Sequence, residues 1–435
     1  MGQLNEELIR KISNIKKEPV WMLEFRLNSL KSFFELDNPN FGPKINIDFS
    51  KINYYKKVSD EKDDWAKVDV NIKQTFDDLG VIDAENKYLC GVSNQYESEV
   101  VYHKNKFDND KIIFCSTDEA LKNHPELFKK YFNNLVKYNE NKYTAINGAL
   151  WSGGTFIYIP PYTKLDRPLQ SYFRINSVSL GQFERTIIIV DEGSELSYIE
   201  GCTAPTYSEN SLHAGVVEIY VGKNAKCKYS TIQNWSTDVY NLVTKRAIVE
   251  ENGLMEWVDG NLGSKVTMKY PSSILKGDNS RGNSISIAYA KNGQYLDAGA
   301  KMIHIGKNTK SNIISKSIAE NGGVSNYRGT TKITTSAENA KANIKCDTIL
   351  LDDVSISDTI PQNIVLNDSS SLEHEASVSK ISEEKMFYLK SKGLDEDAAK
   401  LMIIMGFINE FKNELPMEYA VELNRLLTGD VACKI

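Results

Sequence analysis

The sequence is poor in cysteine, and its cysteines lie far apart. Only six occur in 435 residues, and no two of them form a C-x-x-C pair. This spacing excludes a zinc ribbon, a thioredoxin-type site and a cluster motif made of four cysteines from this chain alone. We expect reduced thiols, most of them buried as small apolar side chains. They are Cys90, Cys115, Cys202, Cys227, Cys346 and Cys433.

Motifs for nucleotide hydrolysis and for common hydrolase chemistry are missing as well. The run GKNTK at residues 306–310 lacks the upstream glycine and the following hydroxyl of a phosphate-binding loop. No G-x-S-x-G or H-E-x-x-H motif occurs, and the chain has only five histidines, so general-base candidates are few. The sequence therefore predicts a protein that is not an enzyme by itself.

Long apolar runs and an excess of basic residues are also absent. The net charge of −6 argues against a nucleic-acid partner or an anionic membrane surface. No stretch approaches the length that spans a bilayer, and residues 1–17 contain no apolar signal region. Gly2 does not start a myristoylation motif, because position 6 is Glu6. We expect a cytoplasmic chain with no nucleic-acid and no membrane partner.

What the sequence does contain divides it into three regions. Residues 1–150 are mixed and partly helical and are expected to form an N-terminal domain. Residues 151–376 consist of short alternating runs between turns rich in Gly, Asn and Asp, with little proline, which is typical of strands. Residues 377–435 return to helical spacing and are expected to form a helical C-terminal region. The fold class predicted is therefore mostly β with helical ends.

Helix signals can be placed in both end regions. Apolar residues recur at helical spacing within residues 18–36 and 125–135. Near the other end, Ser382 can cap a helix that stops at Gly393, and a second helix follows it. A further helix is expected after Pro416. Such a helical end either caps the last coil of the β region or docks a partner, and the sequence leaves both open.

A turn motif recurs through the strand region. KNAK at 223–226 returns as KNTK at 307–310 and ENAK at 338–341, each followed by an alternating strand. The turn centres fall at residues 193, 224, 252, 279, 308, 339 and 367, with steps of 31, 28, 27, 29, 31 and 28. A period of this size indicates stacked coils, each of which needs its neighbours to bury its apolar face. The repeat favours a β-helix or related solenoid, with a two-sheet sandwich as the alternative.

One pair of segments could carry metal chemistry. Cys346 in NIKCDTILLDD and His374 in LEHEA are 28 residues apart, about one coil, so they are expected on adjacent rungs. A thiolate, an imidazole and the carboxylates of Glu373 and Glu375 are plausible iron ligands. Strand alternation sends the two glutamates to one face and His374 to the other, so not all of them can reach one metal. Two ligand types are too few for a cluster, which implies a second protein chain. The alternative is a buried, inert cysteine beside a solvated strand edge.

Cys227 is a second cysteine with a possible function. Lys226 and Lys228 flank it and could lower its pKa, which would favour the thiolate. Their side chains alternate to the opposite face, however, so an inert thiol is equally compatible with the sequence.

The remaining singled-out side chains are expected to be structural. We interpret His213 and His304 as hydrogen-bonded histidines rather than ligands. We interpret Arg246 and Arg328 as internal ion-pair or hydrogen-bond partners rather than substrate clamps.

Several of these runs resemble the SufB family of the SUF iron–sulfur cluster assembly system. The resemblance is carried by GAKMIHIGKNTKSNIISKSI, YRG at 327–329, NIKCDTILLDD and SLEHEASVSKISEEKMFYLKSKGL. Upstream, GVSNQYESEVVYH, ALWSGGTFIYIP, LQSYFRIN and KYSTIQNW also resemble it. The resemblance extends from about Pro19 to Gly429.

The resemblance implies a right-handed parallel β-helix core and a scaffold role in assembling nascent iron–sulfur clusters. It implies a SufC-type ABC ATPase docked at the helical end, a SufD-type paralogue or second SufB copy as pairing partner, and sulfur from a cysteine desulfurase and sulfur-transfer protein. Cys346 then resembles the essential interface cysteine and Glu375 a cluster ligand, with His374 and Glu373 in support. Some complexes of this system also bind reduced flavin, which no motif localises here.

One position departs from the family pattern. Some members carry a sulfur-accepting cysteine in the strand after TKRA, where this chain has Val249. Cys227 is the nearest alternative acceptor.

Two other functions stay open from the sequence. One is a SufD-like structural subunit of the same complex, against which Cys346 and the SufB-like N-terminal motifs argue. The other disregards the resemblance and is a β-helix carbohydrate-active enzyme with carboxylates in a groove. Such enzymes are usually secreted, and no signal region is seen.

Overall fold

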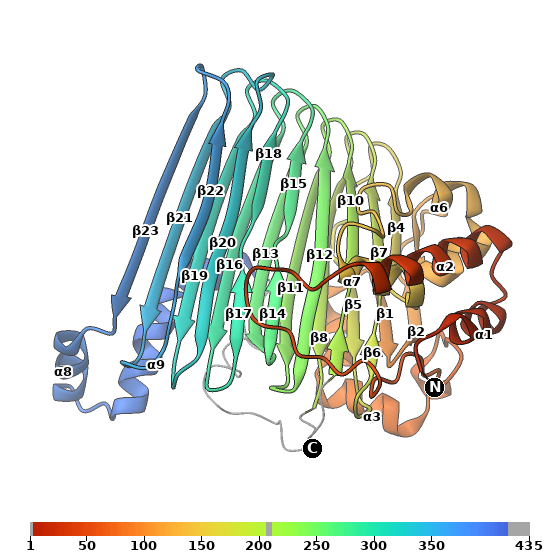
Figure 1. The fold of residues 1–435 in the computed structure, drawn as a ribbon, viewed down its shortest axis with the longest axis horizontal. Helices are drawn as coiled ribbons and strands as arrows, with labels where there is room; N and C mark the ends of the chain where they lie inside the picture. Colours follow the sequence, from red (N-terminus) through yellow and green to blue (C-terminus); the bar gives the residue numbers. More distant parts are fainter. Residues whose placement is uncertain (1–2, 206–210, 416–435) are drawn as a thin grey trace.

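Two long, mostly parallel β-sheets face each other and share one stack of coils (Figure 1). The computed structural model describes residues 3–205 and 211–415. Each coil places one strand in the first sheet and one or two in the second, and successive coils pair in parallel. The β-solenoid core expected from the repeat is therefore confirmed, and the two-sheet sandwich is not formed.

Among the described residues, the first sheet has ten strands. In spatial order they are β2 (Glu99–Asn105), β1 (Gly91–Tyr96), β5 (Leu169–Arg174), β8 (Glu195–Thr203), β11 (Lys226–Trp235), β13 (Leu254–Gly263), β16 (Arg281–Ala290), β19 (Lys310–Ala319), β21 (Lys341–Leu350) and β23 (Ser371–Lys380).

The second sheet has thirteen strands in the described part of the chain. Its main path is β14 (Val266–Lys269), β17 (Tyr295–Ala298), β20 (Val324–Ile333), β18 (Lys301–His304), β15 (Ser272–Leu275), β12 (Val239–Val249), β10 (Val216–Val221), β7 (Arg185–Val190), β4 (Thr155–Ile159) and β3 (Ile113–Ser116). Off this path, β22 (Thr359–Val365) pairs with β20, β9 (Ser211–His213) with β12, and β6 (Gly181–Gln182) with β9.

The predicted turn centres are the corners where coils stack. Asn224, Asn252, Asn279, Asn308 and Asn339 all have φ between 55° and 60°. This left-handed conformation is tolerated best by Gly and Asn. Each corner also bonds to the next coil: the Asn308 amide, for example, donates to the Glu338 carbonyl at 2.7 Å. The turn motif therefore sets the pitch of the stack.

Helices lie at the two ends of the chain. At the N-terminal end they are α1 (Glu6–Lys16), α2 (Val20–Glu35), the 3₁₀ turn η1 (Trp65–Lys67), α3 (Val70–Asp78), α4 (Val81–Tyr88), α5 (Thr117–Asn123), α6 (Pro125–Tyr131) and α7 (Lys142–Leu150). At the other end they are α8 (Glu383–Ser391), α9 (Glu396–Phe407) and α10 (Asn409–Glu414).

The N-terminal region covers the first coils instead of standing apart from them. Apolar side chains of α1, α2 and α7, such as Leu8, Leu30 and Ile146, pack with Leu242 and Met268 of the second sheet. In addition, β1 to β3 extend the two sheets themselves, since β1 pairs in parallel with β5 and β3 pairs with β4. The solenoid thus begins before residue 151, and β23 carries it to Lys380.

The C-terminal helices settle a point that the sequence left open. Ile404, Ile408 and Phe411 pack on the outer face of the ten-stranded sheet against Ile232 and Ile287. Of these helices, α9 and α10 therefore lie on a sheet face, and the last coil stays uncovered at its edge (Figure 1). Ser382 caps α8, as expected, and Gly393 follows it with φ 96°. The helix expected after Pro416, and Cys433, lie outside the described residues.

Candidate functional site

Cys346 and His374 come together at the last two rungs of the ten-stranded sheet. On β21 and β23, Ile344 is registered opposite His374 and Cys346 opposite Ala376, and these four side chains share the inward face. The Cys346 sulfur lies 3.7 Å from His374 Nε2. Cys346 is 2% exposed, and His374 is half-buried. The pairing expected from one-coil spacing is present.

The His374 ring is oriented by a third side chain. Asn363 on β22 places its amide nitrogen 3.2 Å from His374 Nδ1. Because an amide nitrogen can only donate, Nδ1 accepts, and the neutral ring carries its proton on Nε2, which faces the sulfur. The ring is thereby fixed as a donor to Cys346. If that proton moved to Nδ1, with the Asn363 side-chain oxygen turned to accept it, the neutral ring could ligate a metal through Nε2.

The two glutamates of LEHEA lie on the opposite face of β23. Glu373 and Glu375 are exposed and registered opposite Asn343 and Lys345, which also point outward. The structure thus does not bring them to the Cys346 sulfur within one chain. No group of three potential ligands that could hold a metal occurs among residues 3–205 and 211–415. Their role as ligands stays a prediction that requires ligands from a further chain.

The environment of Cys346 favours the protonated thiol. Burial raises its pKa to about 12, the nearby Asp347 carboxylate adds to the rise, and the Tyr327 hydroxyl opposes it. Burial also lowers the pKa of His374. In the isolated chain the pair is therefore a neutral thiol beside a neutral imidazole. A metal or an assembly partner must displace the thiol proton.

This pair is next to an open end of the solenoid. β23 is the last strand of its sheet, and β22 pairs only with β20 in the described structure. Both strands present unpaired backbone groups, which other strands can join. Apolar side chains also remain uncovered there, among them Val365, Leu366 and Val378. The end that carries Cys346 and His374 has the features of a pairing surface.

Cys227 has a different environment. Its side chain points into the apolar interior with Leu196, Met255 and Val249. Burial raises its pKa to about 12 instead of lowering it. The flanking Lys226 is on the opposite, exposed face and pairs with Glu195, so it does not stabilise the thiolate. Its assignment as sulfur acceptor stays a prediction.

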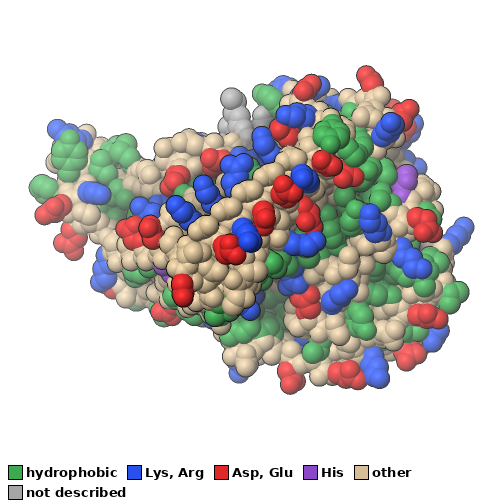
Figure 2. Space-filling view, turned by 90° about the horizontal axis from the view of Figure 1, so that it is seen from above, with side chains coloured by type: hydrophobic (Ala, Val, Ile, Leu, Met, Phe, Trp, Pro, Cys, Tyr) green, Lys and Arg blue, Asp and Glu red, His purple; other side chains and the backbone are tan. Residues whose placement is uncertain are grey.

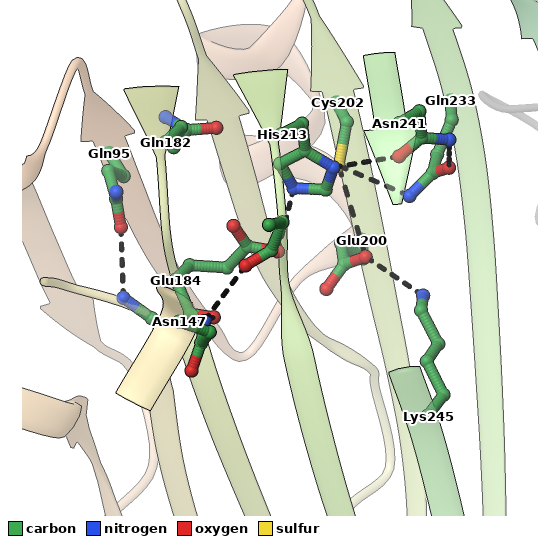
Figure 3. Close-up of polar contacts among 12 residues, drawn as sticks. Gln95, Asn147, Gln182, Glu184, Glu200, Cys202, His213, Gln233, Asn241 and Lys245 are labelled. Atoms are coloured by element: carbon green, nitrogen blue, oxygen red, sulfur yellow. Dashed lines mark hydrogen bonds and ion pairs between the residues drawn. The ribbon is translucent and has the colours of Figure 1, made fainter. Parts of the chain in front are cut away.

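A buried polar network around Cys202 was missed by the sequence analysis (Figure 3). Inside the early coils, Lys245 lies 3.1 Å from Glu200, and the Cys202 sulfur lies 3.9 Å from the same carboxylate. Nearby, His213 contacts Glu184 at 2.7 Å and Asn241 at 2.8 Å. The sequence did contain one signal for this network: Lys245 lies between the apolar residues Val243 and Ala247 on the inward face of β12, and a buried lysine needs a partner.

The four side chains interpreted as structural are confirmed in that role. His304 lies between the hydroxyls of Thr309 and Ser311, at 2.9 Å from each. Arg328 makes two bonds to Asp297, and Arg246 makes two to Glu140. His213 has the two partners given above.

Fold and site together define a β-solenoid whose open end exposes a strand edge beside a buried thiol–imidazole pair. The family model described as SUF system FeS cluster assembly, SufBD core domain, matches residues 173–407. The model of the SufBD protein N-terminal region matches residues 53–171. Together these matches run from the N-terminal region through the solenoid to α9.

Curated relatives agree over nearly the whole chain. Proteins of Staphylococcus saprophyticus and Staphylococcus aureus, each named an iron–sulfur cluster assembly SufBD family protein, are 57% identical over 428 residues. The alignment covers 98% of this chain and 92% of each relative. The chain therefore belongs to the SufBD family of iron–sulfur cluster assembly proteins. No helix of the described residues is long and apolar enough to cross a membrane.

Proposed function

We propose that the chain is the SufB-type scaffold subunit on which nascent iron–sulfur clusters are assembled. The observation that carries the proposal is the Cys346–His374 pair at the open end of the solenoid. Cys346 would supply a thiolate and His374 an imidazole to the iron being delivered. The cluster is cargo that passes on to apoproteins, so a site with few ligands suits its transient binding better than a closed four-ligand site.

The missing ligands would come from a second β-solenoid subunit, either a SufD-type paralogue or another copy of this chain. The β22–β23 edge provides strands whose outer backbone groups are unpaired, together with exposed apolar side chains, for such pairing. In the assembled pair, Glu375 and Glu373 would lie close to the same interface and could serve there as oxygen ligands.

A SufC-type ATPase would dock on the C-terminal helices. None of the nine described side chains of α8 is buried, and Phe387 and Tyr388 are 77% and 60% exposed. Figure 2 shows apolar side chains on the arm at the left end of the molecule, where α8 lies. Exposed aromatic side chains on an otherwise uncovered helix suit a protein partner. Nucleotide hydrolysis would then belong to the partner, and this chain would be no enzyme.

Sulfur would reach the scaffold from a cysteine desulfurase and a sulfur-transfer protein, with Cys227 as the acceptor in this chain. Its burial means that the acceptor strand must open before a partner reaches the thiol. Binding of reduced flavin to the complex stays a prediction without a site.

Reconstitution with matched cysteine variants tests the proposal. The chain is co-expressed with SufC- and SufD-type partners, purified without oxygen and supplied with iron and inorganic sulfide. Wild type and Cys227→Ser are expected to show the same cluster absorption, because free sulfide bypasses the acceptor. Cys346→Ser is expected to lose most of it while the complex stays assembled. Equal absorption in wild type and Cys346→Ser would overturn the proposal.

Replacing sulfide with cysteine and a desulfurase tests the acceptor separately. Cys227→Ser should then form cluster more slowly than wild type. Persulfide transfer to Cys227→Ser at the wild-type rate would exclude Cys227.

The second candidate function is the SufD-like structural subunit, which the family assignment also allows. It predicts an assembled complex whose cluster absorption is indifferent to Cys346. The presence of a thiol next to an imidazole at the open end favours the scaffold role.

A further inference from the structure

Tyr327 reaches Cys346 across the interior of the last coils. It lies on β20 in the second sheet, 3% exposed, and its ring packs in one apolar cluster with Ile344 and Cys346 of β21. β21 belongs to the first sheet, so the tyrosine approaches the sulfur from the opposite wall of the solenoid. Burial raises the pKa of both groups, and the two side chains also act on each other: the thiol adds to the rise at Tyr327, and the hydroxyl opposes the rise at Cys346.

The Tyr327 hydroxyl is buried without an aligned hydrogen-bond partner among the described residues. A buried hydroxyl that lacks a partner is costly and calls for an explanation at a functional site. Its neighbour in the cluster, Cys346, offers a sulfur that becomes a strong acceptor only as a thiolate or as a metal ligand. The hydroxyl is therefore placed to donate weakly to the neutral thiol and more strongly to a thiolate or a metal-bound sulfur.

The backbone makes room for this hydroxyl. A Cβ atom on Gly329 would lie 2.3 Å from the Tyr327 oxygen, so any larger residue there would displace it. Between them, Arg328 points to the other side of β20 and pairs with Asp297. In the YRG run, the tyrosine supplies the hydroxyl and the glycine supplies its space.

We propose that Tyr327 is a positioning residue for the assembly site, whose hydroxyl donates a hydrogen bond to the Cys346 sulfur. In the cluster-free chain, where His374 Nε2 still carries its proton, the sulfur would be held between two donors; with iron bound, the Tyr327 hydroxyl would remain the donor. This inference rests on the proposed function for its purpose, but the contact itself can be tested without any cluster. Hydrogen bonds to a ligating sulfur also tune a cluster's reduction potential.

The contact is tested by the S–H stretching band of Cys346, which falls where other protein groups do not absorb. Infrared spectra of the cluster-free chain are recorded for wild type and Tyr327→Phe, each minus its own Cys346→Ser version, so that the other five cysteines cancel. We expect the Cys346 band to shift in Tyr327→Phe, because only the hydroxyl is removed. An unchanged band would overturn the inference, whether or not Cys346 builds a cluster.

Two further variants separate a hydrogen bond from general packing. Tyr295 lies on the preceding coil, and its hydroxyl accepts a hydrogen bond of 3.1 Å from the Asn326 amide. Tyr295→Phe removes that hydroxyl and should leave the Cys346 band in place. Gly329→Ala keeps the tyrosine but displaces its hydroxyl, and it should shift the band as Tyr327→Phe does. A shift with Tyr295→Phe equal to that with Tyr327→Phe would mean that the band reports packing alone.

In the reconstituted complex, Tyr327→Phe should bind the cluster about ten- to a hundredfold more weakly and lower its reduction potential, while Tyr295→Phe changes neither. Loss of the cluster from wild type itself would contradict the proposed function and leave the infrared result standing. Wild-type retention and potential in Tyr327→Phe would overturn the positioning role.

Discussion

At the residue scale, the interior keeps ionisable side chains either paired or neutral. Lys269 lies 2.8 Å from Asp259, and Arg185 lies 2.9 Å from Glu218, all four fully or nearly fully buried. Within residues 3–205 and 211–415, His304 has only two hydroxyls as partners, and burial lowers its pKa to about 4. A neutral ring suits this position, and a charged one would be left without compensation.

His304 should therefore make the stability depend on pH. Its pKa is about 4 when folded and 6.5 when exposed, so the unfolded chain binds the proton first as the pH falls. Stability is intact above pH 6.5 and is lost as the pH drops toward 4. Relative to His304→Gln, wild type should lose about 2 to 3 kcal/mol of unfolding free energy between pH 7.5 and 4.5. Urea unfolding at both values measures this, and parallel losses in the two proteins would contradict it.

At this scale, the sequence predicted the roles of single side chains whose type leaves few choices. It did not predict contacts between side chains that are far apart along the chain. Structural roles for His304 and Arg328 follow from their placement inside strands. The partner of Lys245 is Glu200, which lies 45 residues away, and only the stacking of coils brings them together. The same holds for Tyr327 and Cys346, because their contact crosses between two sheets.

At the element scale, the turns at the corners set the spacing of the stacked coils. Six of the seven predicted turn centres, from Gly193 to Asn339, have positive φ. The seventh, at residue 367, turns differently, with the Asn367 side chain accepting from Ser369. Because asparagine and glycine tolerate this conformation, the corners were visible in the sequence, three of them as the N-x-K turns at Asn224, Asn308 and Asn339 and the rest as looser turns with Gly or Asn.

Asn308 gives a direct test of the corners. Its φ is 56°, and its amide bonds to the next coil. Asn308→Ala should cost about 1 to 2 kcal/mol of unfolding free energy. The left-handed conformation strains alanine, which lacks the short polar side chain that lets asparagine adopt it. Asn308→Gly, the matched control, should stay close to wild type. Equal losses in both variants, measured by urea unfolding, would mean that the backbone conformation is not the cause.

Strand pairings early in the chain were harder to predict than the corners. β1 reads GVSNQY, which is polar, yet it is fully buried between β2 and β5. Three helices, α5 to α7, lie between β1 and its partner β5 in the sequence. The N-terminal region therefore appeared in the sequence to be a domain separate from the solenoid. Helix starts were easier, since the predicted cap Ser382 stabilises the start of α8 by a local bond.

At the scale of the whole molecule, the two ends of the solenoid differ. The first coils are covered by N-terminal helices and strands, whereas β22 and β23 end the stack with an open edge (Figure 1). Val378 on β23 is 52% exposed because no further coil stacks on β23 in the described part of the chain. An uncovered solenoid end normally needs a cap, and a pairing subunit would supply one.

Charges placed at this end should weaken pairing and little else. The double variant Val365→Lys and Val378→Lys should bind the second β-solenoid subunit about tenfold or more weakly. Exposed apolar side chains of this kind anchor interfaces, and each lysine would place a charge there instead. Val70→Lys is the control and should pair normally, because Val70 is an even more exposed valine, on α3 at the covered end. Sedimentation of the purified subunits measures both. Unchanged pairing in the double variant would place the partner elsewhere.

The central claim, that Cys346 holds cluster iron, is tested most directly by Mössbauer spectroscopy of the iron-57-loaded complex. The account predicts cluster iron in wild type and only non-cluster iron in Cys346→Ser, with the same subunits present in both. Cluster iron with identical parameters in both complexes would contradict it and would move the assembly site to another residue or to the partner.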